Sequence, residues 1–512
     1  MKYLFTLISA LLAFNACAQS HFGDIDIEQI KKLQMAQVAI SSLYVDSVDQ
    51  KKLAEDAING MLSKLDPHSS YTNAKETKKL NEPLSGNFEG IGVSFNMVKD
   101  TLLVLQVISK GPCEKAGIMA GDRIIAVNGV TIAGVKMDRD SIMTKLRGPK
   151  GTIANLDVVR RGAHGVLHFK VVRDKIPVNT VDAAYMITPT AGYIHLDSFG
   201  ATSGKEVNDK IKELQKQGMK DLILDLGMNG GGYLNAAQEV ASQFLPNGSM
   251  IVYTDGRVMP RQELRSEGEG LMQNEGRVVV LVDEFTASAA EIVSGALQDH
   301  DRGTIIGRRT FGKGLVQRPI DLPDGSMIRL TVSHYYTPSG RCIQKPYVKG
   351  EKKEYEQDLE KRYTRGELTN IDSIHLDSTK VYKTLAKGRT VYGGGGIMPD
   401  IFVPLDTTAY TPYYRALRRY NLINEWTLRY VDENRKVLKR KYRKFQNFEE
   451  KYEVPASLTD SIMAEGKRKK VEPKDDKELQ ATLDDLRFTL KSTIAFEMVW
   501  RRVSSSSIFL LA

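Results

Sequence analysis

The chain has 512 residues, a formal net charge of +9 at pH 7, 41% hydrophobic residues and 26% charged residues. One hydrophobic core rarely supports such a length, so we expect two to four domains. No long Lys/Arg block alternates with aromatic residues, which argues against nucleic acid as a partner. Basic residues gather in 435–445 and 466–474, where the simplest interpretation is a solvated helix face.

The N-terminus has the pattern of an export signal. An apolar run over 3–14, too short to span a bilayer, precedes small residues at 16–18. We therefore predict an exported, periplasmic protein with a signal peptide over 1–18. Cys17 offers the alternative of a lipidation site that would anchor the protein to the membrane. Only Cys113 and Cys342 follow, too few for a disulfide framework in a chain of this length.

A helical N-terminal region is expected over 19–82. Apolar residues at helical spacing predict two helices before residue 65, and Asp49 is placed to cap the second one. Pro67, in the segment DPHSSY, ends that helix. His68 follows in the same loop, where holding the turn is favoured over a catalytic role.

Short β-rich runs separated by turns come next. With the segments GIGV (90–93) and AGIMAGDRIIAVNG (116–129), they resemble a PDZ domain, which we place at 83–173. PDZ domains add a peptide C-terminus as an extra strand and hold its carboxylate on backbone N–H groups of a loop. The resemblance implies that this loop consists of Gly90, Ile91, Gly92 and Val93.

Continuous apolar strands alternate with helices over 174–406. This pattern predicts an α/β core whose sheet is covered on both faces. The charged stretch 346–390 is expected to be an insertion into that core. We predict a polar helical region over 407–512, although its last residues, WRRVSSSSIFLLA, fit no pattern.

Ser288 stands where the buried strand of RVVVLVDEFTAS turns into a helix. As an N-cap, its hydroxyl would accept a hydrogen bond from the helix backbone, and Glu291 three residues later completes a capping box. As a nucleophile it would need a base, and no histidine stands near it in the sequence. For an isolated serine, the cap is the favoured interpretation.

Two other segments favour the nucleophile. Glycines 230–232 follow a buried strand and leave backbone N–H groups free to point into a cleft, as an oxyanion hole requires. Lys313 lies between two glycines in FGKGLVQ, 25 residues after Ser288. A desolvated, neutral lysine can replace histidine as the base that activates a serine.

The motif SAAEIVSGALQDHDRGTIIGRRTFGKGLVQ (288–317) is typical of the C-terminal processing peptidases, also called tail-specific proteases. GMLSKLDPHSSY, LRGPKGT and GGGGIMPD occur in that family's usual order, so the resemblance covers most of 27–405. It implies a multi-domain α/β protein with a crotonase- or ClpP-like peptidase core, an inserted PDZ domain and flanking helical regions. It implies no metal or organic cofactor, and substrates that are proteins or peptides with accessible C-termini.

The resemblance also assigns roles. Ser288 is expected to be the nucleophile, Lys313 the general base and Gln317 the residue that orients the lysine. The backbone N–H groups of Ala289 and Gly231 are expected to form the oxyanion hole.

Two features depart from this expectation. Gly227 stands where the family usually has arginine, which is expected to loosen the turn of the glycine cluster. In an ideal strand, positions four residues apart lie about 13 Å from each other. Lys313 and Gln317 can therefore touch only if Gly312 and Gly314 bulge the strand or if the long side chains lean together.

Three functions remain open on the sequence alone. The leading one is an exported serine endopeptidase that recognises protein C-termini. The second is a non-catalytic PDZ scaffold with a decayed core, which the presence of Ser288, Lys313 and Gln317 disfavours. The third is an acyl-transfer or hydratase enzyme on a crotonase-like sheet, which the PDZ domain disfavours. The sequence is compatible with a homo-oligomer but does not identify one.

Overall fold

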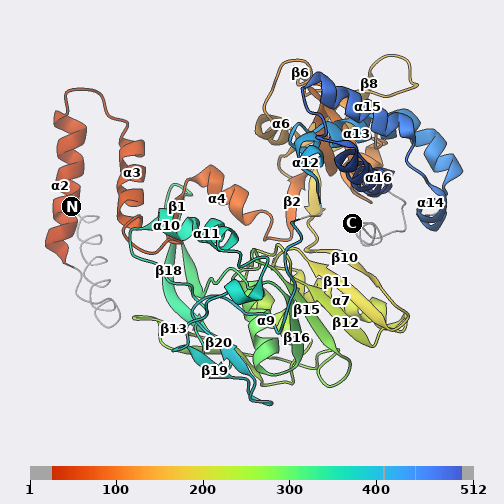
Figure 1. The fold of residues 1–512 in the computed structure, drawn as a ribbon. Coiled ribbons are helices and arrows are strands. Elements are labelled where there is room, and N and C mark those ends of the chain that lie inside the picture. Colours follow the sequence, from red (N-terminus) through yellow and green to blue (C-terminus); the bar gives the residue numbers. More distant parts are fainter. Residues whose placement is uncertain (1–25, 408–409, 444, 499–512) are drawn as a thin grey trace.

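A computed structural model of the chain describes residues 26–407, 410–443 and 445–498. The predicted signal peptide, Cys17 and the terminal segment from Trp500 lie outside the described residues. In Figure 1 an α/β core is flanked by the N-terminal helices on one side and by a β domain with the C-terminal helices on the other. This multi-domain α/β architecture is the predicted one.

The N-terminal region begins with α2 and α3, and Asp49 caps α3 by accepting the backbone N–H groups of Lys51 and Lys52. Helix α2 has no buried residue, so its apolar side chains are exposed. Strand β1 pairs with β18 (Met327–Tyr336) of the α/β core, with Ser70 opposite Arg329. The region therefore contributes a strand to the core, which the boundary predicted at residue 82 does not anticipate. Its elements are α2 Ile27–Leu43, α3 Gln50–Leu62, β1 Ser70–Thr72 and α4 Ala74–Asn81.

The β domain has its own hydrophobic cluster and a sheet in the order β3-β4-β5-β7-β8, with β6 on β5. Strands β2 and β9 pair antiparallel and form the neck through which the chain enters and leaves the domain. The edge strand β3 faces α6, where the Arg139 guanidinium lies 5.5 Å from the centroid of the Phe95 ring. The elements are β2 Asn87–Gly90, β3 Val93–Val98, β4 Thr101–Val107, α5 Pro112–Ala116, β5 Arg123–Val127, β6 Val130–Thr131, α6 Arg139–Leu146, β7 Ile153–Val159, β8 Leu167–Val172 and β9 Asp174–Pro177.

The α/β core contains a six-stranded sheet in the order β10-β11-β12-β15-β16-β21, parallel except for the β10–β11 pair. A second sheet has the order β1-β18-β13-β14, with β17 on β18. Helix α9 is buried along its whole length and contacts α8, β16 and β13. The elements are β10 Val181–Met186, β11 Ala191–Leu196, α7 Ser203–Gln215, β12 Asp221–Asp225, α8 Leu234–Ala241, β13 Met250–Asp255, β14 Gln262–Arg265, β15 Val278–Val282, α9 Ala289–Asp299, β16 Gly303–Gly307, β17 Leu315–Asp321, β18 Met327–Tyr336 and β21 Ile401–Phe402.

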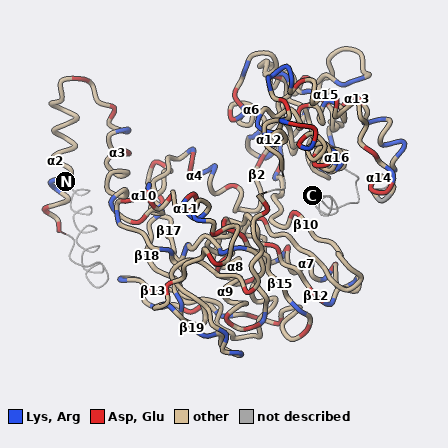
Figure 2. The backbone as a smooth tube through the Cα atoms, viewed as in Figure 1, with Lys and Arg blue, Asp and Glu red and all other residues tan. Residues whose placement is uncertain are grey.

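The expected insertion and the C-terminal region are also ordered into elements. The C-terminal helices share one hydrophobic cluster and contact the β domain through an ion pair of 2.6 Å between Arg123 and Asp432. Lys436, Arg440 and Lys441 are exposed on α13, and basic residues are spread over these helices in Figure 2, as a solvated face predicts. The elements are α10 Lys352–Glu356, α11 Asp358–Thr364, η1 Ile371–Ser373, β19 Val381–Lys383, β20 Thr390–Tyr392, α12 Pro412–Arg419, α13 Leu422–Lys441, α14 Phe445–Lys451, α15 Ala456–Arg468 and α16 Asp476–Met498.

Candidate active site

Ser288 occupies the sharp turn between β15 and α9, with φ 56° and ψ −116°, a backbone conformation that serine rarely adopts. Its backbone is held on both sides. The N–H donates to Glu291 Oε2 at 2.9 Å, and the carbonyl accepts from the Tyr335 hydroxyl at 3.2 Å. Ser288 and Glu291 stand in the arrangement of a capping box, in which the Glu291 carboxylate accepts the backbone N–H of Ser288. The Ser288 side chain is half-buried.

Glu291 joins the turn of Ser288 to the loop that carries Lys313. Its fully buried carboxylate accepts hydrogen bonds from four donors: the backbone N–H groups of Ser288 (2.9 Å), Gly312 (2.7 Å) and Lys313 (2.9 Å), and the Thr310 hydroxyl (2.5 Å). Burial raises the pKa of Glu291, and these hydrogen bonds act in the opposite direction. Because every partner donates, the ionised carboxylate fits the site. A residue predicted only as a helix cap thus fixes the distance between two segments of the site.

Lys313 lies in the loop before β17 and is largely buried. Burial lowers the pKa of Lys313 to about 8, and the charge of Arg329 on β18 acts in the same direction, against Glu291 and Asp66. An exposed lysine has a pKa of about 10.4 and is almost fully protonated at neutral pH. The burial expected from the sequence therefore gives this amine a substantial neutral fraction near pH 8.

Gln317 lies on β17, opposite Thr331 of β18. The register of the pair shifts between Val316 and Gln317, but the extra residue, Val332, belongs to β18, and the glycines expected to bulge the strand lie before β17 begins at Leu315. The Gln317 amide donates to the Thr331 hydroxyl at 3.4 Å, and that hydroxyl donates to Asp66 Oδ1 at 2.8 Å. Gln317 thus joins a polar network that also includes Asp66, whose charge acts on Lys313.

His68 packs beside the same loop. Its Nε2 shares a hydrogen bond of 2.8 Å with the Tyr355 hydroxyl, and its ring meets Phe311 edge-on at 6.4 Å between centroids. Burial, together with the charge of Lys313, lowers the pKa of His68 to about 4. The ring is therefore neutral at physiological pH and holds the loop, in line with the structural role that the sequence favoured.

The charged insertion also holds the Lys313 loop. Arg362 of α11 is buried and donates to the backbone carbonyls of Thr310 (3.1 Å) and Arg309 (2.5 Å). The Lys345 ammonium lies 4.0 Å from the Phe311 ring centroid and 4.2 Å from that of Tyr355. The hydrophilic composition of 346–390 gave no sign of this role, because only a few of its side chains face the core.

The glycine cluster packs directly on the turn of Ser288. Gly231 has φ 95°, and a Cβ there would lie 2.8 Å from Ser288 Cβ and 2.9 Å from the backbone nitrogen of Ala289, so glycine is required. The Gly231 N–H, however, donates to Asn229 Oδ1 at 2.8 Å. In this Asx turn the predicted oxyanion donor is already engaged by a side chain. The Ala289 N–H, at the first position of α9, has no acceptor within its own helix.

The turn at Gly227 is well held, contrary to the expectation that glycine would loosen it. Asp225 Oδ1 accepts the Gly227 N–H at 2.8 Å, and Asp283 Oδ2 accepts the Met228 N–H at 3.0 Å. The buried Asn229 donates its side-chain amide to the carbonyl of Leu196 at 2.6 Å. Carboxylates from two neighbouring strands thus fix this turn.

The predicted carboxylate-binding loop connects β2 to the edge strand β3. Gly92 has φ 75°, and the carbonyls of Ile91 and Gly92 accept the backbone N–H groups of Cys113 and Ile108, both at 3.0 Å. Gly90 closes β2, and Val93 opens β3. Because β3 has a neighbour on one side only within its sheet, its other edge can accept an added strand.

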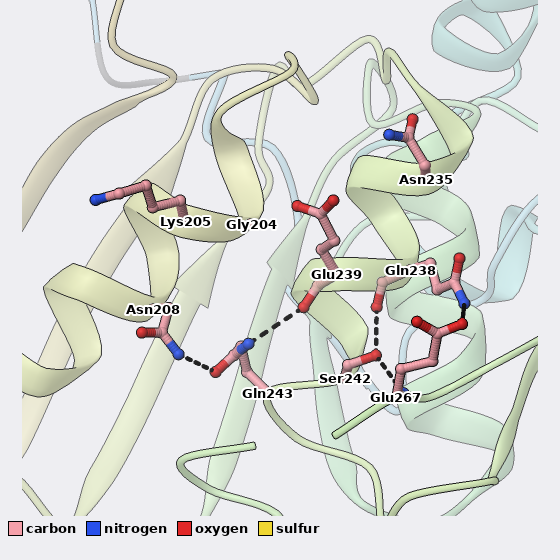
Figure 3. Close-up of a pocket in the computed structure, with 9 residues that line it drawn as sticks. All are labelled: Gly204, Lys205, Asn208, Asn235, Gln238, Glu239, Ser242, Gln243 and Glu267. Carbon is pink, nitrogen blue, oxygen red and sulfur yellow. Dashed lines mark hydrogen bonds between the residues drawn. The ribbon is translucent and has the colours of Figure 1, made fainter. Parts of the chain in front are cut away.

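Two hollows lie on the core. Figure 3 shows a polar one of about 390 Å³ between α7 and α8, with no predicted site residue in its lining, where Asn208 donates to Gln243 at 2.8 Å. A more apolar one of about 470 Å³ is lined by Glu284 and Phe285, from the turn of Ser288, and by side chains of α10 and α11. The second hollow therefore includes two residues of the segment between β15 and α9, although Ser288 itself does not line it.

Comparisons with known proteins show the family to which the chain belongs. The model described as "Peptidase family S41" matches residues 190–352, a PDZ domain model matches 90–180, and "Activating protease CtpB N-terminal domain" matches 13–77. The C-terminal helices match a family of unknown function over 413–499. The carboxy-terminal-processing protease of Bartonella bacilliformis is 39% identical over 353 residues, which cover 67% of this chain and 80% of that protein. The chain belongs to the carboxy-terminal processing proteases.

Other carboxy-terminal processing proteases are similar as well. Carboxy-terminal processing protease CtpA of Bacillus subtilis is 37% identical over 66% of this chain and 74% of its own length. Among solved structures, the photosystem II D1 C-terminal processing protease is 26% identical, covering 74% of this chain and 94% of that chain with a TM-score of 0.37. In the described part of this protease no group of metal-ligating side chains is found, and no helix there is long and apolar enough to cross a membrane.

Changing Glu291 to glutamine should slow peptide hydrolysis by this protease about 100-fold. The amide NH2 group would face two of the donors that the carboxylate now accepts, and an unsatisfied buried donor is destabilising by about 1–3 kcal/mol. The measurement is kcat together with thermal unfolding. Glu206→Gln is the matched control, because Glu206 accepts backbone N–H groups of Thr180 and Val181 at 2.7 and 3.0 Å, outside the predicted catalytic set. Equal loss of kcat in both variants would show that Glu291 has no special effect on the site.

Proposed function

We propose that this carboxy-terminal processing protease is a serine endopeptidase that uses Ser288 as nucleophile and Lys313 as general base. The observation that carries the proposal is the buried Glu291 carboxylate, which accepts N–H groups from both residues at 2.9 Å. The lowered pKa of Lys313, about 8, supports the role of base, and the sharp turn that holds Ser288 before α9 supports that of nucleophile.

The reaction would proceed through an acyl-enzyme. The neutral Lys313 amine takes the proton of the Ser288 hydroxyl while the oxygen attacks the carbonyl carbon of the scissile peptide bond. The resulting ammonium then protonates the leaving amine as the C–N bond breaks. Lys313, neutral again, deprotonates the water that hydrolyses the ester. Gln317, through Thr331 and Asp66, would keep the lysine in place.

The oxyanion would be stabilised first by the Ala289 N–H, which lies at the positive end of the α9 dipole. The Gly231 N–H would join it after the Asx turn with Asn229 opens. The hollow beside Phe285 would accept an apolar substrate side chain. An unfolded substrate with an apolar C-terminus, incubated with the protease and analysed by mass spectrometry, tests the proposal. New peptides with the wild type but not with Ser288→Ala support it, and intact substrate with both favours the non-catalytic scaffold.

The PDZ domain is proposed to select substrates by their C-terminal carboxylate. Amidation removes the negative charge that the N–H groups of Gly90–Val93 would bind, so amidated peptides should be cleaved about tenfold more slowly at low substrate concentration. The comparison is kcat/KM for a free-acid peptide and its amide. A Gly92→Val variant is the control, because φ 75° and a Cβ position 3.0 Å from Ile176 should disturb this loop alone. Equal kcat/KM for acid and amide in the wild type would contradict the proposal.

We propose that the protease is exported to the periplasm, with Cys17 as the alternative site of a lipid anchor. The apolar run over 3–14 and the small residues at 16–18 support export. Mass spectrometry of the mature N-terminus distinguishes signal cleavage after residue 18 from lipidation at Cys17. A mature protein that begins at Met1 would contradict both.

A further inference from the structure

His195 lies near the end of β11, the second strand of the six-stranded sheet, between a carboxylate and a carbonyl. Its Nδ1 is 2.5 Å from Asp182 Oδ1, and its Nε2 is 3.4 Å from the carbonyl oxygen of Gly227. Both partners are acceptors, so both ring nitrogens must carry a proton to donate to them. These two hydrogen bonds therefore require the protonated, imidazolium form of His195.

The strand pairing shows how Asp182 reaches the ring. The register of β10 on β11 shifts between Val181 and Ala183, so Asp182 is the extra residue of a β-bulge opposite His195. Bulges redirect side chains and are frequent beside active sites. The bulge explains why a carboxylate on β10 and an imidazole on β11 meet side by side.

The groups around His195 are acidic or neutral. Asp182 approaches from β10, and Asp225 lies opposite His195 on β12. Tyr193 on β11 donates its hydroxyl to Asp225 Oδ2 at 2.6 Å, and Asp283 approaches the same loop from the end of β15. Burial acts to lower the pKa of His195, but the hydrogen bond and charge of Asp182, with the charge of Asp225, raise it to about 9.

The carbonyl that His195 holds belongs to the loop that packs on the nucleophile. From Gly227 the chain runs to Asn229, whose carbonyl accepts the Ala287 N–H at 2.9 Å, and to Gly231, which abuts the Ser288 turn. A shift of the Gly227 peptide would therefore move the glycine loop against Ser288.

We propose that His195, oriented by Asp182, is a positioning residue that holds the glycine loop against the turn of Ser288. This inference rests on the proposed peptidase function. When the imidazolium loses a proton, the short bond to Asp182 retains the Nδ1 proton, and the Nε2 lone pair then faces the Gly227 carbonyl. Because the pKa is raised from 6.5 to about 9, the hold on the loop is complete below 6.5 and is lost as the pH rises through about 9.

The first test is the pH profile of peptide hydrolysis. In the wild type kcat should rise through about pH 8, as Lys313 becomes neutral, and fall through about pH 9, as His195 becomes neutral. His195→Gln supplies a neutral amide donor, so it should keep most of the activity and lose the falling limb. His195→Leu supplies no donor, so its kcat should be about tenfold below that of the wild type at neutral pH, with KM unchanged, and the difference should disappear as the pH rises above about 9.

The matched control is His168→Gln, because His168 forms the same kind of pair with Asp157 at 2.7 Å on the exposed surface of the PDZ domain. His168→Gln should leave both the rise and the fall of kcat with pH unchanged. A falling limb that persists in His195→Gln, or a wild-type kcat in His195→Leu, would overturn the proposal.

A second measurement does not need peptidase activity. Amide hydrogen exchange of a peptide covering 226–233 should be about tenfold faster in His195→Leu than in the wild type at pH 7, and unchanged in His168→Gln. Equal exchange in all three proteins would overturn the proposal even if they are active. A wild type that cleaves no substrate, but shows this pattern of exchange, would contradict the peptidase function and leave the role of His195 in the loop supported.

Discussion

Lys313→Arg is expected to be as inactive as Lys313→Ala, with a loss of kcat of about 10⁴-fold or more. Arginine preserves the positive charge but does not give up its proton at any pH of interest, so it cannot act as the base. In the wild type, kcat/KM should rise with pH through about 8, the pKa to which burial lowers Lys313. Rates at several pH values for a chromogenic peptide, with both variants, check the expectation.

The same lysine should lower the stability of the fold. Because its pKa falls from 10.5 to about 8, the unfolded chain binds more protons between these values. Lys313→Met should therefore raise the free energy of unfolding by roughly 3 kcal/mol below pH 8, and the gain should disappear as the pH approaches 10.5. A lysine whose replacement changes neither stability nor activity would not be the base. His68, His195 and His334 would then be the residues to replace.

Ser288→Ala should be folded and inactive, and Ser288→Gly should be inactive and more stable than Ser288→Ala. Either change removes the hydroxyl that would attack the substrate, with a loss of at least about 10⁴-fold in kcat. The two differ because φ 56° with ψ −116° strains any side chain and not glycine. Release of that strain should stabilise Ser288→Gly by about 1 kcal/mol relative to Ser288→Ala, after the entropy that glycine adds to the unfolded chain.

Thermal unfolding and peptide cleavage measure the two effects separately. Both variants should still bind a C-terminal peptide through the PDZ domain, which calorimetry can detect. Residual cleavage by Ser288→Ala near the wild-type rate would exclude Ser288 as the nucleophile. A lower stability of Ser288→Gly than of Ser288→Ala would show that the turn stores no backbone strain.

The local elements were predictable because each has a short-range cause. Asp49 caps α3 as its position before an amphipathic run indicates, and the buried strands before the glycine cluster and Ser288 appear as β12 and β15. What periodicity could not supply is contact between distant segments. Nothing near Glu291 in the sequence indicates that its carboxylate accepts the N–H groups of Gly312 and Lys313.

Two details of the glycine cluster could not be predicted, for a similar reason. The Gly231 N–H donates to the Asn229 side chain. The pattern of glycines in the sequence does not reveal that this side chain competes for the N–H. The turn at Gly227 is held by Asp225, Asp283 and His195, which come from three different strands. Gly227 has no side chain to hold its turn, and these three side chains hold the turn instead. They are close together only because of the order of the strands in the sheet.

The candidate active site is held together by contacts between residues far apart in the sequence. These contacts limit how early during synthesis the site can form. His68 meets Tyr355 across 287 positions, Asp66 meets Thr331 across 265, and Arg362 anchors the loop of Lys313. At about 5–20 residues per second, a ribosome needs roughly 4–15 s to extend the chain from Ser288 to Arg362. A nascent chain that already carries the serine therefore has no ordered lysine beside it. Unfinished polypeptides would remain harmless to neighbouring proteins until both ends of the core have been translated.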